Sequence, residues 1–215
     1  MITAIPQTKT LPLTNFTEEL RFEFPDLPQP LFDYYCVEVA RIMASEGHLF
    51  KTVIEFNTKQ NVTRYLLDTK DESEIIGIYR ITSRDVNTTD VYIEVDRTFT
   101  KPQRVVPINL AWFDTVQSVL HVKTVYEHGV MNVYTYTSPV LGTCSLPEVI
   151  RTKYWQTFML GVKGKLLLIT GRQWTNLQLG QAYYTEFKKQ LAIDSITKST
   201  NGMVGVAKIN FGRAL

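Results

Sequence analysis

The sequence has few of the side chains that bind metals or form disulfides: two cysteines and three histidines among 215 residues. Two cysteines cannot build the disulfide framework of a small secreted domain. No CxxC, HxxxH or HExxH motif is present, so the spacing typical of transition-metal sites is missing. Cys36 lies among apolar residues and is expected to be a buried thiol, whereas Cys144 is expected in a loop. We therefore expect no metal and no other cofactor.

An excess of charge of one sign is also lacking, since 23 lysines and arginines accompany 21 aspartates and glutamates, for a net charge of +2. Proteins that grip nucleic acid by neutralising phosphates usually carry a clear basic excess. DNA near this surface is expected to be tolerated without sequence-specific binding. The apolar run Leu166–Ile169 is too short to span a bilayer, and residues 1–16 do not have the pattern of a signal peptide. These features predict a soluble protein made in a cytoplasm.

Recognisable catalytic motifs are missing as well. No GxSxG motif for acyl transfer is present. Residues 161–165 superficially resemble a phosphate-binding loop, but they lack its spacing and follow a predicted helix instead of a strand. A cluster of carboxylates falls in one predicted turn, where solvation is the ordinary explanation: Asp68, Asp71, Glu72 and Glu74. We expect a protein that is not an enzyme; the disfavoured alternative is a small hydrolase that uses His121 or His128.

What the sequence does contain is two different hydrophobic periodicities, which predict an α+β fold. The expected architecture is a helical bundle of three main helices with an inserted antiparallel β-sheet domain and extended terminal arms. The N-terminal arm is expected over residues 1–29; five of the nine prolines fall within residues 1–30, and proline restricts the backbone to extended, irregular structure. Its apolar residues predict that it lies on another surface, of its own molecule or of a neighbour. They are Leu11, Leu13, Phe16, Leu20, Phe22 and Phe24.

The helical body is expected to combine two parts of the chain, residues 30–48 and 145–200. In the first part, apolar residues recur at helical spacing over about 30–46. Pro30 suits the first turn of a helix, where a missing N–H costs nothing. Gly47 suits the left-handed cap that ends many helices. This part therefore predicts one amphipathic helix.

The second part of the helical body is expected to begin with a capping box formed by Ser145 and Glu148. Apolar residues at helical spacing follow, interrupted by Gly161 and Gly164. Glycine is unfavourable inside a helix, so these two residues either permit a close helix contact or mark a kink. Gly171 is expected to end this segment, and Asn176 is expected to cap the final helix.

Residues 49–144 are expected to form the β-rich insertion. They contain seven stretches rich in β-branched and aromatic residues, several of which alternate apolar with polar side chains, separated by turn-forming residues. The pattern predicts an antiparallel sheet of five to seven strands. Residues 201–215 mix glycine with spaced apolar residues and show no sustained helical stripe, so they are predicted to be a C-terminal tail.

Aromatic side chains are candidate anchors. Trp155, Trp174 and Phe187 are predicted to anchor the core or a subunit interface, because large aromatic residues usually contribute buried area. A carbohydrate platform formed by the tryptophans, Trp112 included, is the disfavoured alternative. A mild basic run on the final helix is expected to be a solvated face: Lys188, Lys189 and Lys198.

Two regions of the chain resemble the head-to-tail adaptor proteins of tailed bacteriophages. Residues 28–41 (PQPLFDYYCVEVAR) and 61–67 (NVTRYLL) resemble the opening of these adaptors. The closing half resembles adaptors of the tail tubular A type in the order of its features: the sequence LPEVI, Trp155, the turn from Gly171 to Trp174, and a helix with Ala182 and Phe187. The resemblance covers roughly residues 25–67 and 145–200, and the β-rich middle matches only in kind.

The resemblance implies a structural virion protein at the head–tail junction. Such subunits form a homo-oligomeric ring, commonly of twelve, between the portal protein and the downstream tail or nozzle protein, with DNA passing through the lumen. We expect the C-terminal tail to dock on the portal through four apolar and two cationic residues: Val206, Lys208, Ile209, Phe211, Arg213 and Leu215. The β-rich insertion would face the tail or the ring exterior. An alternative is another tail-completion or baseplate protein.

Overall fold

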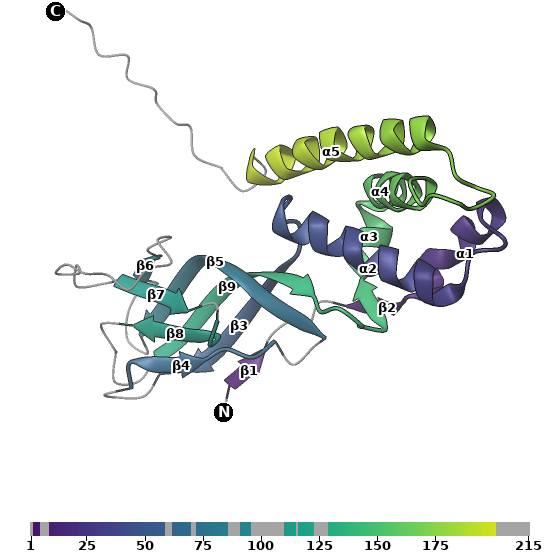
Figure 1. Cartoon of the computed structure of the whole chain (residues 1–215). Coiled ribbons are helices and arrows are strands. Elements are labelled where there is room, and N and C mark those ends of the chain that lie inside the picture. The colour runs from purple at the N-terminus through teal and green to yellow at the C-terminus, as the bar shows by residue number, and fades with distance from the viewer. Residues whose placement is uncertain are drawn as a thin grey trace, which may run out of the picture.

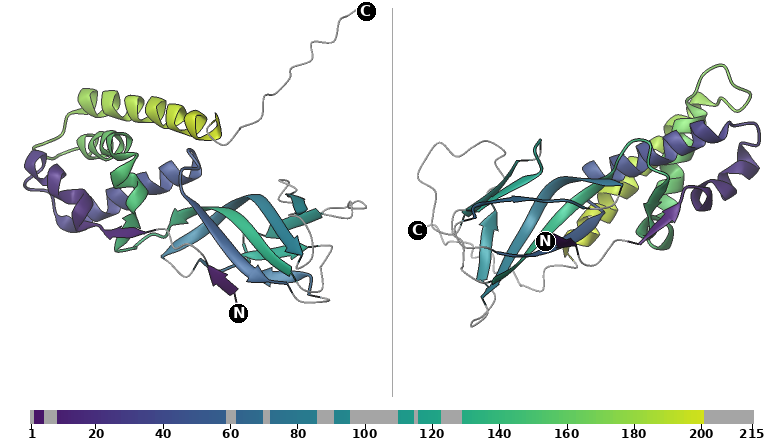
Figure 2. Two further views of the ribbon diagram at one scale, coloured as in Figure 1. Left: turned by 180° about the vertical axis from the view of Figure 1, so that it is seen from behind. Right: turned by 90° about the horizontal axis from the view of Figure 1, so that it is seen from below.

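The computed structural model describes residues 2–4, 9–58, 62–69, 72–85, 91–95, 110–114, 116–122 and 129–200. Its helices gather in one lobe and the larger of its two sheets forms the other (Figures 1 and 2). The helices are α1 (Thr14–Glu23), α2 (Gln29–Ser45), α3 (Glu148–Thr152), α4 (Trp155–Leu167) and α5 (Leu177–Thr200). The strands are β1 (Ile2–Ala4), β2 (Thr10–Pro12), β3 (Lys51–Asn57), β4 (Arg64–Leu66), β5 (Ser73–Asp85), β6 (Val91–Val95), β7 (Leu110–Asp114), β8 (Val119–Val122), β9 (Gly129–Pro139) and β10 (Ser145–Pro147). The predicted α+β class is confirmed. The body, however, has more than three helices.

The N-terminal segment differs from the extended arm predicted for residues 1–29. It contains helix α1, together with β1 and β2. Most of its apolar residues pack on the helical lobe, where Phe16 and Leu20 are fully buried, but Phe22 is exposed. The prediction failed because Pro12 and Pro25 lie outside α1 and delimit it, while Phe16 and Leu20 lie one helical turn apart and form a buried stripe.

Helix α2 confirms the helix predicted over about 30–46, with Pro30 in its first turn. The predicted left-handed cap at Gly47 is wrong, because His48 is the residue that adopts the positive φ, at 51°. Gly47 is needed for space instead. A Cβ atom there would lie 2.5 Å from Leu191 Cδ1 and 2.8 Å from the Met43 carbonyl oxygen. The turn after α2 thus packs directly against α5.

Helices α4 and α5 approach each other closely because glycines line their contact. A Cβ atom on Gly164 would lie 2.9 Å from the backbone nitrogen of Tyr184, and one on Gly161 would lie 3.0 Å from the Phe187 ring. Of the two predicted roles for these glycines, the close helix contact is confirmed, since α4 continues through both. Gly171, between α4 and α5, has the left-handed φ of 74° that ends the preceding segment.

The predicted start of the second helical part is wrong. Ser145 lies in β10, which pairs antiparallel with β2, so it does not cap a helix. Helix α3 begins at Glu148 after Pro147, with no side-chain cap within the described residues. The sequence pattern is compatible with a capping box, but the pairing with the N-terminal β2 outcompetes it. Asn176 does cap α5, since its Oδ1 accepts a hydrogen bond from the Leu179 amide at 3.0 Å.

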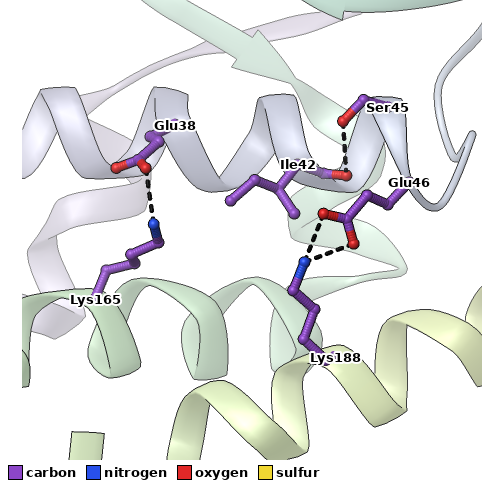
Figure 3. Close-up of polar contacts among 6 residues, drawn as sticks. All are labelled: Glu38, Ile42, Ser45, Glu46, Lys165 and Lys188. Carbon is purple, nitrogen blue, oxygen red and sulfur yellow. Dashed lines mark hydrogen bonds and ion pairs between the residues drawn. The ribbon is translucent and has the colours of Figure 1, made fainter. Parts of the chain in front are cut away.

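Ion pairs join α2 to the other two long helices (Figure 3). Glu38 accepts from Lys165 of α4 at 2.8 Å, and Glu46, just after α2, accepts from Lys188 of α5 at 2.5 Å. Partly exposed pairs of this kind contribute little to stability, about 0 to 1 kcal/mol each. Their effect is to orient the three helices relative to one another.

The larger sheet has the strand order β1-β3-β9-β5-β6-β7-β8-β4. Seven of its described strands lie between residues 51 and 139, at the top of the predicted range. The described pairs are antiparallel except β6–β7, which is parallel and departs from the prediction. Phe56 of β3 contacts Tyr65 of the terminal strand β4, with ring centroids 4.6 Å apart. The sheet therefore curls around a second apolar core formed by one of its faces.

Side chains from both lobes meet at the junction between them. Arg41 of α2 donates to the Pro139 carbonyl of β9 at 2.7 Å and pairs with Glu74 of β5 at 2.9 Å. Glu72, just before β5, accepts from the Thr143 hydroxyl and from the Cys144 amide, the latter at 2.9 Å. These hydrogen bonds lower the pKa of the Glu72 carboxyl, because they favour its ionised form. Glu72 thereby holds the β9–β10 connection to the sheet.

Replacing Glu72 with Gln should reduce stability at neutral pH and have less effect in acid. Because the folded-state pKa of Glu72 lies below its ordinary value of 4.5, its contribution is present above that value and is lost as the pH falls through the folded-state pKa. Urea unfolding of both proteins at neutral pH and below pH 4.5 would measure the difference. Glu18→Gln, on the exposed side of α1, is the control. An equal gap between wild type and Glu72→Gln at both pH values would contradict the prediction.

Candidate interaction surfaces

The residues predicted to dock on a portal, Val206, Lys208, Ile209, Phe211, Arg213 and Leu215, lie outside the described residues. The predicted tail therefore keeps its role only as a hypothesis from the sequence. The described chain ends with α5, so α5 is the element that leads into this segment (Figure 1).

The predicted aromatic anchors lie against the helical core of their own molecule. Phe187 is fully buried, and Trp155 stacks on Phe158 with ring centroids 5.8 Å apart. Trp155 also donates through Nε1 to Glu19 of α1 at 3.1 Å, which ties α1 to α4. Trp174 packs against the same core, and its buried Nε1 has no hydrogen-bond partner among the described residues. For Trp112 the structure describes only the backbone, within β7.

The two described histidines fall in separate parts of the sheet lobe. His121 lies in β8 in register with Arg64 of β4. His48 precedes β3, and its ring contacts Tyr136 at 4.7 Å between centroids. His128 lies outside the described residues. Within the described ranges, no group of three or more histidine, cysteine, aspartate or glutamate side chains is arranged to hold a metal ion.

Sequence reasoning missed a cluster on the outer face of β3, β9 and β5, which we term the tyrosine face: Lys51, Tyr79, Arg80, Tyr134 and Tyr136. Register places Lys51 opposite Tyr136. A register shift between Ile78 and Arg80 turns both Tyr79 and Arg80 outward, because a bulge interrupts the alternation of a strand. The only signal in the sequence was the alternation of Tyr134 and Tyr136 in β9.

Cations and rings are interleaved on the tyrosine face. The Lys51 ammonium lies 4.4 Å from the centroid of the Tyr79 ring, and the Arg80 guanidinium lies 5.2 Å from that of Tyr134. Burial and the neighbouring tyrosines raise the pKa of Tyr79 to about 12, because they disfavour its ionised form. Burial lowers the pKa of Lys51. Tyrosine and arginine are enriched at protein interfaces, so the arrangement suits contact with a protein.

A second exposed surface lies on α5, on the side opposite its buried residues Phe187 and Leu191. Three of its large apolar residues are well exposed: Leu179 by 41%, Ile193 by 46% and Ile196 by 63%. We term this surface the outer stripe of α5; its members are Leu179, Ala182, Glu186, Lys189, Ile193 and Ile196. Figure 1 shows α5 at the outer edge of the helical lobe, with α4 on its inner side. The outer stripe therefore faces away from the molecule.

Comparison with known proteins identifies no relative: no family model matches the chain, and no curated protein matches it. Among the described helices, none combines the length and the apolar character required to cross a membrane.

Proposed function

We propose that this protein is a non-enzymatic structural subunit of a bacteriophage head-to-tail adaptor, which joins the portal vertex to the tail and continues the DNA channel. One observation carries the proposal. The chain runs through a long helix, an inserted sheet, a second helix, a glycine–tryptophan turn and a final long helix. In this structure these are α2, β3–β9, α4, the turn at 171–174 and α5. The same order was expected from the resemblance.

The exposed surfaces of the molecule favour a subunit that binds other protein chains over a protein that acts as a monomer. The outer stripe of α5 exposes apolar side chains, and the tyrosine face presents aromatic rings with cations. Exposed apolar surface of this kind marks interaction sites. The proposed partners are copies of the same chain in a ring, commonly of twelve, the portal protein, and a downstream tail or nozzle protein.

Because the N-terminal segment folds back onto the same molecule, residues 201–215 are the remaining candidate for a docking arm. They contain Lys208 and Arg213 but no aspartate or glutamate. With the apolar residues among them, they suit a groove that has apolar pockets and an acidic rim. We propose that this groove belongs to the portal.

Deletion of residues 203–215 tests the portal contact. The full chain, mixed with its portal, should form a ring-bearing complex visible by electron microscopy. The deletion variant should lose portal binding yet unfold in one cooperative transition, because it keeps every residue of the two described cores. Normal portal binding by the deletion variant would refute the tail assignment. Capture of the full chain by tail proteins, without binding to the portal, would favour a tail-completion or baseplate protein instead.

A further inference from the structure

The outer stripe of α5 repeats with a spacing that suits pairing with another helix. Its six residues are separated alternately by three and four positions, so they lie on one face of the helix. Ala182 is exposed, as are Glu186 by 49% and Lys189 by 67% at their side chains. The opposite face packs on α4 through Gly180 and Phe187. The stripe is thus a continuous exposed seam of the kind found in two-stranded helical pairs.

The chemistry of the outer stripe is symmetric about its middle. Apolar residues occupy both ends, and an acid and a base, Glu186 and Lys189, occupy the centre. When two such helices align antiparallel about a point between residues 187 and 188, every position meets a complementary one. The layers are Leu179 with Ile196, Ala182 with Ile193, and Glu186 with Lys189, each formed twice. A parallel alignment would instead place the two glutamates together and the two lysines together.

We propose that α5 pairs antiparallel with α5 of a second copy of this chain, through the outer stripe. A two-fold contact uses the same patch on both subunits, so the patch must be complementary to itself, and this stripe is. Apolar layers at both ends would be removed from water, while two ion pairs at the centre set the register. Leu179, Ile193 and Ile196 would be covered on pairing. The outer stripe also supports the adaptor proposal, but a two-fold contact between two copies of the chain can be tested without the portal.

A single helix pair lies at the small end of protein interfaces, so the dimer is expected to be weak and to depend on concentration. Sedimentation velocity of the full chain at rising concentration should show a growing dimer fraction. Glu186→Lys and Lys189→Glu, each alone, convert both central ion pairs into repulsions and should weaken the homodimer roughly tenfold. Gln181→Lys is the matched control, because Gln181 is exposed on α5 outside the stripe.

Mixing the two charge variants gives the sharpest test. Each variant loses the ion pair between residues 186 and 189 within its own helix, but the mixture restores both pairs between helices. The mixture should therefore dimerise at least as well as the wild type, and so should the double variant Glu186→Lys/Lys189→Glu. A chain that remains monomeric at every concentration, or a mixture that dimerises no better than either variant, would overturn the proposal. If residues 201–215 of the same chain cover the stripe, the protein would remain monomeric, and this result would also overturn the proposal. Neither result bears on portal binding.

Discussion

A Phe16→Ala variant should lose about 3 to 5 kcal/mol of the free energy of unfolding, because removal of a buried aromatic side chain forfeits its transfer energy and leaves a cavity. Phe16 is fully buried, and its ring lies 5.7 Å from that of Phe158 and 6.2 Å from that of Trp155, between centroids. These contacts join α1 to α4, across more than half of the chain. The loss of stability in this variant thus measures how much the packing of α1 on α4 contributes to the free energy of unfolding.

Phe22→Ala is the matched control, because Phe22 lies on the same helix but is 89% exposed. It should change stability by less than about 0.5 kcal/mol. Chemical denaturation followed by far-ultraviolet circular dichroism would measure both variants. If Phe16→Ala changes the free energy of unfolding as little as Phe22→Ala does, the N-terminal segment is not docked on its own molecule. The extended arm predicted from the sequence would then be the better description.

A Gly164→Leu variant should lose about 3 kcal/mol or more, since overpacking a close contact forces side chains and backbone to shift. At Gly164 the nearest atoms are the backbone nitrogen and Cα of Tyr184, 2.9 and 3.1 Å from an added Cβ. Backbone cannot rotate away as a side chain can, so α4 and α5 must separate. Leucine is a good helix former, so the loss cannot come from helix propensity.

Ala192→Leu is the control for this effect, because it places the same side chain at an exposed position of α5. Its stability should stay within about 0.5 kcal/mol of the wild type. Thermal and denaturant unfolding of the two variants would be compared at neutral pH. A Gly164→Leu protein as stable as Ala192→Leu would mean that α4 and α5 do not meet as closely as described.

Local patterns predicted much of the secondary structure. Several elements could be predicted because each depends on residues close together in the chain: the helix around residues 30–46, the cap at Asn176, the turn at Gly171 and most strands between 50 and 138. The same reasoning failed at Ser145, where pairing with a distant strand replaced a capping box. It also failed at Gly47, where the need for space beside Leu191, and not a left-handed backbone, explains the glycine.

The candidate surfaces were less accessible to sequence reasoning. Trp155, Trp174 and Phe187 were identified as anchors, but only the structure places them against the core of their own molecule. The tyrosine face was missed, because Lys51, Tyr79 and Tyr136 come from three strands and meet through register and a bulge. The outer stripe of α5 was hidden for a related reason. Apolar residues lie on both sides of α5, and only packing on α4 distinguishes the buried side from the exposed one.

Side-chain periodicity and turn-forming residues were enough to predict the α+β class and the alternation of helical and extended segments, because both act over a few positions of the chain. The packing of the helices was needed to show that α1 folds back onto α4, that Gly161 and Gly164 bring α4 and α5 together, and which face of α5 is exposed. Those features depend on contacts between residues far apart in sequence, whose free energy arises only when the helices pack together.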